Sequence, residues 1–269
     1  MSIKLEEICK SVIELATNTG EFIREQRKHF SADKIETKGL HDFVSYVDKE
    51  AEKILVNGLA KLLPEAGFIA EEGTGEPKSN GLNWIIDPLD GTTNFIHGLP
   101  PYCISIALAN DKTILLGLIY EVTLNECFYA WGNGKAYLNG NEIRVSNTQA
   151  VNDSLIATGF PYYDYTRIEP FLKSMAHFMR SSHGLRRLGS AATDLAYVAC
   201  GRFEAFYEHG LRAWDVAAGA FIVEQAGGRV SDFGGGDNYV FGKEIVATNK
   251  NIFGEFQKIV SSYLEQNKQ

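Results

Sequence analysis

The sequence predicts an α/β (α+β) fold, a layered sandwich in which helices cover the faces of sheets. Amphipathic segments stand near both ends of the chain, and a run of apolar strands with short polar turns fills the middle. In the second half, helical and extended segments alternate. An apolar sheet face must be buried against another layer, so this order of segments predicts helix-covered sheets.

The first half begins with two predicted helices and continues with strands. Apolar residues recur at helical spacing over Leu5–Lys28 and again from about Asp48 to Leu63, where Pro64 ends the helix. The polar turns Asn110–Lys112 and Thr123–Asn125 then predict an antiparallel meander. The predicted strands are Phe68–Ala70, Trp84–Ile86, Cys103–Ala109, Ile114–Tyr120, Glu126–Trp131 and, after the turn Asn139-Gly140, Ile143–Val145.

The second half is predicted to alternate between strands and helices. The expected strands are Leu155–Thr158, Ala205–Tyr207 and Glu244–Ala247. The expected helices are Ile168–Arg180, Ser190–Cys200, Trp214–Gln225 and Asn251–Leu264. No low-complexity tract or repeat divides the chain, so residues 1–269 are predicted to form a single domain.

The chain is acidic, with 34 Asp and Glu against 26 Lys and Arg and a formal net charge of −8. This balance argues against nucleic-acid binding, which needs a basic surface. The charged N-terminus does not resemble a signal peptide, and Asp111-Lys112 interrupts the apolar stretch Ile104–Tyr120, so we expect a cytoplasmic protein with no membrane segment. The four cysteines form no C-x-x-C pair and are expected to be reduced and buried.

The densest acidic segment in an apolar setting is Trp84–Phe95, Trp-Ile-Ile-Asp-Pro-Leu-Asp-Gly-Thr-Thr-Asn-Phe. Pro88 restrains Asp87 to an extended backbone, and Gly91 permits a tight turn. Asp90 is then expected to cap a helix whose first amides face an anion. Two carboxylates on one rigid turn suit Mg²⁺, which prefers oxygen ligands and shares phosphate oxygens with its substrates. The alternative is an ordinary strand-to-helix turn.

At this string the chain resembles a known family. Asp87–Phe95, preceded by Trp-Ile-Ile, resembles the first signature of the inositol monophosphatase family, and Trp214–Gly219 resembles the second. Other segments that match the family in the same order are Asp42–Asp48, Phe68–Glu72, Leu188–Ala192 and Phe206–Glu208. The resemblance covers nearly the whole chain. It implies the α-β-α-β-α sandwich of the sugar phosphatases, with a metal-binding half over about 1–150 and a substrate-binding half over about 151–269.

The resemblance implies two or three Mg²⁺ ions per active site. Glu71, Asp87 and the backbone carbonyl of Leu89 would hold the first ion. Asp87 would bridge to a second ion held with Asp90 and Asp215, and a weaker third ion would share Glu71. Two metals can clamp the attacking and leaving oxygens of a phosphoryl transfer and lower the pKa of a bound water.

The resemblance also implies roles for residues around the attacking water. Thr92 would orient the water while donating a hydrogen bond to Asp48, and Glu71 would count among the catalytic residues as well as the metal ligands. The implied substrate-binding residues are Asp90, Gly91, Thr92, Gly189, Ser190, Ala191, Glu208 and Asp215.

Several of these residues also have a purely structural interpretation. Glu72 could be the metal ligand in place of Glu71. Asp48 and Asp215 each stand near the start of a predicted helix, where they could serve as caps. Glu208 could be a surface acid at the end of a strand.

The expected activity is Mg²⁺-dependent hydrolysis of myo-inositol 1-phosphate or a similar polyol phosphate by a metal-activated water. Fructose 1,6-bisphosphate, 3′-phosphoadenosine 5′-phosphate, histidinol phosphate and NADP are alternative substrates within the same superfamily. If Arg212 faces the site, it would favour a second anionic group on the ligand. The alternative from another class is a regulatory binding protein of the transcription machinery. The resemblance also implies a homodimer and inhibition by Li⁺.

Overall fold

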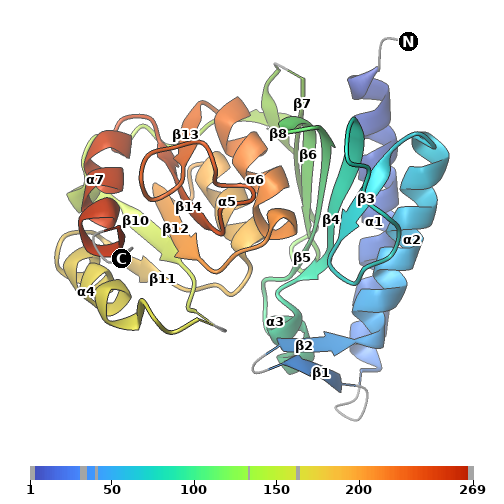
Figure 1. Cartoon of the computed structure of the whole chain (residues 1–269), viewed down its shortest axis with the longest axis horizontal. Coiled ribbons are helices and arrows are strands. Elements are labelled where there is room, and N and C mark those ends of the chain that lie inside the picture. Colours follow the sequence, from blue (N-terminus) through green and yellow to red (C-terminus); the bar gives the residue numbers. More distant parts are fainter. Residues whose placement is uncertain (1–3, 31–34, 40–41, 133, 162–163, 266–269) are drawn as a thin grey trace.

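The computed structural model describes residues 4–30, 35–39, 42–132, 134–161 and 164–265. Helices and sheets alternate in five layers (Figure 1). Helices α1 (Leu5–Lys28) and α2 (Tyr46–Leu62) cover the outer face of a seven-stranded sheet. Helices α5 (Ala191–Ala199) and α6 (Ala213–Gln225) lie between this sheet and a five-stranded sheet. The far outer face carries α4 (Ile168–Arg180) and α7 (Phe253–Leu264). This order confirms the predicted α-β-α-β-α sandwich.

The seven-stranded sheet contains the predicted meander. Its first two strands are parallel, and every later pair is antiparallel. Asn139 and Gly140 both have positive φ angles, 49° and 84°, as a two-residue hairpin turn requires. In spatial order the strands are β3 (Gly67–Ala70), β4 (Leu82–Asp90), β5 (Cys103–Asn110), β6 (Thr113–Glu121), β7 (Glu126–Trp131), β8 (Ala136–Leu138) and β9 (Asn141–Ile143).

The five-stranded sheet is mixed, with β10 parallel to both of its neighbours and β14 antiparallel to both of its own. Three of its strands were predicted, whereas the two edge strands were not, because they are short and lack an apolar run. In spatial order the strands are β11 (Gly184–Arg186), β10 (Leu155–Thr158), β12 (Ala205–His209), β14 (Glu244–Asn249) and β13 (Gly228–Ser231).

A small hairpin lies beside the short helix α3 (Thr92–His97) at one end of the seven-stranded sheet (Figure 1). Its strands β1 (Ile35–Gly39) and β2 (Asp42–Ser45) were not predicted. Helix α2 follows at once, two residues earlier than expected, because Ser45 serves as its N-cap. A single 3₁₀ turn, η2 (Val151–Asp153), lies in the connection between the two sheets.

The central helices approach the seven-stranded sheet closely because small residues stand at the contacts. A Cβ atom on Gly117 of β6 would lie 2.7 Å from the carbonyl oxygen of Ala218 in α6. A Cβ atom on Gly219 would lie 2.5 Å from the Cβ atom of Leu195 in α5. Larger residues at these two glycines would push the layers apart, so the close packing brings the strand ends of both sheets to a common cavity.

Cys9, Cys103 and Cys127 are free and buried, as predicted, whereas Cys200 is free but only half-buried. Cys200 stands at the C-terminal end of α5, where the helix leaves the core. Among the described helices, none is long and apolar enough to cross a membrane.

Candidate active site

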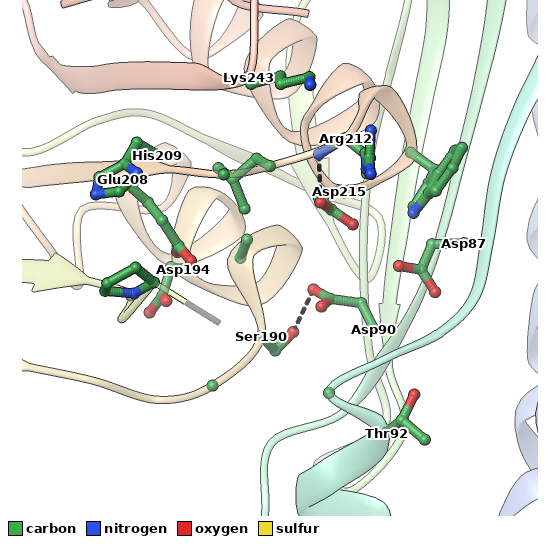
Figure 2. A pocket seen from close by; sticks show the side chains of 18 of the residues that line it. Asp87, Asp90, Thr92, Ser190, Asp194, Glu208, His209, Arg212, Asp215 and Lys243 are labelled. Carbon is green, nitrogen blue, oxygen red and sulfur yellow. Dashed lines mark hydrogen bonds between the residues drawn. The ribbon is translucent and has the colours of Figure 1, made fainter. Parts of the chain in front are cut away.

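A cavity of about 780 Å³ lies where the ends of the two sheets meet the central helices (Figure 2). It is lined by every predicted metal-binding and substrate-binding residue. These are Glu71, Asp87, Leu89, Asp90, Gly91, Thr92, Gly189, Ser190, Ala191, Glu208 and Asp215. Asp48 does not line the cavity, but it contacts Thr92, which does.

The end of strand β4 supplies the central carboxylates. Asp87 is 2% exposed, and its Oδ1 accepts a hydrogen bond from the backbone N–H of Leu89 at 2.9 Å. The pairing of β4 with β5 shifts register between Asp87 and Asp90, as expected where Pro88 cannot donate to the ladder. The strand thus extends to Asp90, four residues beyond the predicted end, and both carboxylates project from one rigid segment.

The predicted capping role of Asp90 is wrong. The N-cap of α3 is Gly91, whose φ of 93° turns the chain, and no side chain caps this helix. Asp90 instead belongs to β4 and faces the central layer, where its Oδ2 accepts hydrogen bonds from Ser190 Oγ and from the Ala192 N–H, both at 2.7 Å (Figure 2). Asp90 therefore satisfies an amide in the first turn of α5, one hundred residues away in sequence.

Asp48 both stabilises the start of α2 and contacts the cavity through Thr92. Its Oδ2 accepts hydrogen bonds from the N–H and hydroxyl of Ser45, at 2.9 and 2.6 Å, and completes a capping box. Its Oδ1 accepts a hydrogen bond from Thr92 Oγ1 at 2.9 Å. The structural and the catalytic interpretations of Asp48 are thus compatible, because they use different oxygens of one carboxylate.

Asp215 also combines two roles. Its Oδ2 accepts a hydrogen bond from the backbone N–H of Arg212 at 2.6 Å, which caps helix α6 (Figure 2). The helix start is anchored to the seven-stranded sheet, because Ser105 Oγ donates to the carbonyl of Trp214 at 2.9 Å. The carboxylate is therefore fixed in the cavity wall by contacts from both sides.

The acidic residues of the cavity raise one another's pKa values. Burial raises the pKa of Asp87 well above its usual value, and the negative charges of Glu71, Asp90 and Asp215 raise it further. Burial also raises the pKa of Asp215 to about 8, with Asp90 as the next cause. Glu71 lines the cavity and Glu72 is not among the lining residues, which favours Glu71 as the ligand. Of the four mutually repelling carboxylates, Asp87 is fully buried, and a bound cation would relieve the repulsion.

The chemistry of this donor set fits Mg²⁺. All the side-chain donors are carboxylate oxygens, and the carbonyl of Leu89, at the same turn, is available beside them. Within the described ranges, no three His, Cys, Asp or Glu side chains come close enough to hold an ion by themselves. An ion here would complete its coordination with water, backbone or phosphate oxygens, which is the habit of Mg²⁺ rather than of a closed structural metal site.

Glu208 lies deep in the cavity wall and not on the surface. It is 7% exposed, and burial, followed by the charge of Asp90, raises its pKa to about 8. Gly159 makes room for it, since a Cβ atom there would lie within 1.9 Å of the Glu208 carboxyl carbon. The interpretation of Glu208 as a surface acid is therefore wrong.

Five further Asp, Arg and Lys residues of the cavity were not singled out as site residues. They are Asp164, Arg167, Arg187, Asp194 and Lys243. The sequence does mark Asp194, because it is the one charged residue of the apolar helix segment Ala191–Ala199. It does not mark Lys243, which directly precedes β14 and lies far in sequence from the predicted ligand residues.

Arg212 lines the cavity, as the hypothesis of a second anion site requires. Lys243 lines the same part, beside Arg212 in Figure 2. Lys243 has a φ of 66°, and its carbonyl accepts hydrogen bonds from the N–H groups of Gly210 and Leu211 at 2.7 and 3.2 Å. Two basic side chains therefore stand on the wall beyond Asp215.

Comparison with known proteins identifies the family. The sequence model of the inositol monophosphatase family matches residues 4–265. The chain is 40% identical over 250 residues to the putative Nus factor SuhB of Neisseria meningitidis serogroup B, covering 93% of this chain and 96% of that protein. It is 41% identical over 231 residues to the inositol-1-monophosphatase of Mesorhizobium japonicum, covering 86% and 87%. The solved structure of the IMPase of Thermotoga maritima matches with a TM-score of 0.86 and 34% identity, covering 94% and 96%.

The family match extends over both sheets and includes every segment that lines the cavity. With a family match from residue 4 to residue 265, the chain belongs to the inositol monophosphatase family.

Proposed function

We propose that this chain hydrolyses a phosphate monoester of a polyol, such as myo-inositol 1-phosphate, in a Mg²⁺-dependent reaction. The observation that carries the proposal is the group of carboxylates at the end of β4 and the start of α6, all of which line one cavity. Glu71, Asp87 and the Leu89 carbonyl would hold one ion, and Asp87, Asp90 and Asp215 a second. The bound ions would neutralise the phosphate charge and lower the pKa of a water.

Thr92 and Asp48 would orient the attacking water. Thr92 Oγ1 lies 2.9 Å from Asp48 Oδ1 and 3.0 Å from the Leu89 carbonyl oxygen, and its single proton can be donated to either acceptor. When the proton is donated to Asp48, which does not line the cavity, the lone pairs of the hydroxyl can accept a hydrogen bond from a water there. Asp48 is 1% exposed and fixed by Ser45, so the Thr92 hydroxyl is held in one orientation. This arrangement needs no covalent phosphoenzyme.

The direct test is phosphate release from a substrate panel with and without Mg²⁺. The panel contains inositol 1-phosphate, fructose 1,6-bisphosphate, 3′-phosphoadenosine 5′-phosphate, histidinol phosphate and NADP⁺. We expect Mg²⁺-dependent release that is fastest with inositol 1-phosphate. Faster release from another substrate would keep the reaction type and change the substrate. Absence of release from all of them would refute the enzyme hypothesis.

Replacing Asp48 should impair turnover more than substrate binding. In Asp48→Asn the amide group can no longer accept from Ser45 and Thr92 in the same way, so the Thr92 hydroxyl loses its fixed orientation. We expect kcat to fall by about 10²-fold, with KM changed by less than about 3-fold. Steady-state kinetics at saturating Mg²⁺ would measure both constants, and Thr92→Ser, which keeps the hydroxyl, should retain most activity. A matching rise in KM would contradict an orienting role.

The basic pair Arg212 and Lys243 bears on the bisphosphate alternative. If these side chains contact a second anionic group, Arg212→Ala should lower kcat/KM for fructose 1,6-bisphosphate by about 10-fold or more, and by much less for inositol 1-phosphate. The exposed Arg180→Ala is the matched control for loss of a charge. Equal kinetics on mono- and bisphosphates before and after the change would remove the second anion site.

A role in transcription is the alternative that one comparison favours, since the Neisseria relative is named a putative Nus factor. Such a role would not require turnover. A variant without phosphatase activity, such as Asp87→Asn, would then still bind purified transcription factors as the unchanged protein does. The intact carboxylate group supports catalysis as the primary proposal.

A further inference from the structure

The side chain of Asp194 is buried in the cavity wall, and one of its carboxylate oxygens has no hydrogen-bond partner within the described part of the chain. It is 1% exposed, and its Oδ1 atom has no partner among the residues that the structure describes. Burying a polar group without a hydrogen bond costs free energy, so groups of this kind call for an explanation. The rest of helix α5 is apolar apart from Thr193, so packing alone does not account for an acid at this position. A ligand that enters the cavity would supply the missing partner.

A second carboxyl group stands beside the first. Figure 2 shows Asp194 and Glu208 on the same side of the cavity, opposite Asp87 and away from Thr92. Both residues line the same cavity, and the charge of Glu208 raises the pKa of Asp194. Gly159, which has no side chain, lets the Glu208 carboxyl rest directly against the backbone of the strand end. Both acids are therefore held in fixed positions on one wall.

We propose that Asp194 is a further, specificity-determining residue: beside Glu208, which the family resemblance already implies as a substrate-binding residue, it completes a two-carboxyl subsite and binds a second, adjacent hydroxyl group on the alcohol part of the substrate. This inference rests on the proposed phosphatase function, because the subsite faces a phosphate held at Asp87 and Asp90. Adjacent hydroxyls on a ring suit two neighbouring carboxyl groups, since each hydroxyl can reach one of them.

The surroundings favour hydroxyl groups over an ammonium group. Arg187 lines the same cavity, and its positive charge lowers the pKa of both Asp194 and Glu208, so a cation already stands beside the pair. Burial nevertheless raises both pKa values, that of Glu208 to about 8. A carboxyl group accepts hydrogen bonds when it is ionised and can also donate one when it is protonated, so the pair offers both kinds of contact. A hydroxyl group can do both, whereas an ammonium group only donates.

Two substrates with the same ring separate this role from a structural one. Inositol 1-phosphate and cyclohexyl phosphate differ only in the ring hydroxyls. In Asp194→Leu, we expect the ratio of kcat/KM for the first to that for the second to fall by about 10- to 100-fold, as the loss of a hydrogen bond to a charged or strongly polar group predicts. The melting temperature should rise or stay unchanged, because an unpartnered buried carboxyl is replaced by an apolar side chain of similar size.

The isosteric Asp194→Asn variant is the second arm. An amide can donate and accept, so the ratio should fall less than in Asp194→Leu, and this variant decides the outcome if the leucine variant does not fold. An unchanged ratio in the folded variants would overturn the subsite, as would faster wild-type turnover of histidinol phosphate, which carries an ammonium group. Mg²⁺-dependent release from cyclohexyl phosphate by the unchanged protein tests the phosphatase function separately. Absence of release from both ring phosphates would overturn both proposals.

Discussion

Asp87→Asn should abolish Mg²⁺-dependent phosphatase activity without unfolding the protein. We expect kcat/KM to fall by about 10³-fold or more, since an amide supplies neither the negative charge nor the bridging oxygens that two divalent ions need. In the absence of metal the variant should be as stable as the unchanged protein or more stable. Burial and the charges of Glu71, Asp90 and Asp215 already disfavour the ionised form of Asp87, and the amide removes this repulsion.

Phosphate release over a Mg²⁺ titration and calorimetric melting in EDTA would measure the two effects of Asp87→Asn. Asp237→Asn is the control, because Asp237 is exposed and is not among the residues that line the cavity. A fully active Asp87→Asn enzyme would refute the metal assignment. A large drop in melting temperature in EDTA would instead show that Asp87 serves mainly the fold.

Removal of metal should make thermal stability fall as the pH rises from 6.5 to 8. Burial raises the pKa of Asp215 from 3.8 to about 8 and that of Glu208 from 4.5 to about 8. A carboxyl whose pKa is raised by folding holds its proton more tightly in the folded state, so its contribution is present at low pH and is lost as the pH approaches 8. Each such group changes the free energy of unfolding by up to about 1.4 kcal/mol per pH unit.

Melting temperatures in EDTA and in Mg²⁺ across this pH range would test the effect. In EDTA we expect a fall of several degrees, because 1 kcal/mol corresponds to about 2–4 °C in a chain of this size. Bound Mg²⁺ holds Asp215 in its ionised form, so the fall should be smaller with metal. His209 acts in the opposite sense, since burial lowers the pKa of its imidazole from 6.5, and it matters only below the tested range. A flat or rising profile in EDTA would contradict the prediction.

The ligand residues were predictable because they occupy local, strongly patterned segments. Asp87 and Asp90 follow an apolar run and frame a proline, and the structure places both in the cavity wall. The error over Asp90 arose because its partners, Ser190 and Ala192, lie about one hundred residues away. The local pattern predicts that Asp90 caps the helix that follows it, α3. In the folded structure Asp90 instead accepts a hydrogen bond from the Ala192 amide, in the first turn of α5.

The rest of the wall depends on contacts that no local pattern encodes. Lys243 faces the cavity only because its carbonyl is bound by the turn Gly210-Leu211. Strands β11 and β13 are the two edge strands of the five-stranded sheet. Their strand structure depends on pairing with a neighbouring strand, so their own residues indicate a strand only weakly. Sheets covered by helices, in contrast, were predicted from the apolar periodicity along the chain, and the order of the five layers was implied by the family resemblance.

Through its contacts with Ser190 and Ala192, the carboxylate of Asp90 links the seven-stranded sheet to helix α5 of the central layer. Asp87 and Asp90 precede the connection between β9 and β10, whereas Asp215 follows it. Cut within this connection, the chain would give two fragments, neither of which carries the full carboxylate set. Activity would then report reassociation of the fragments, so the fold offers a natural split point for a complementation reporter whose signal requires the catalytic centre to be rebuilt.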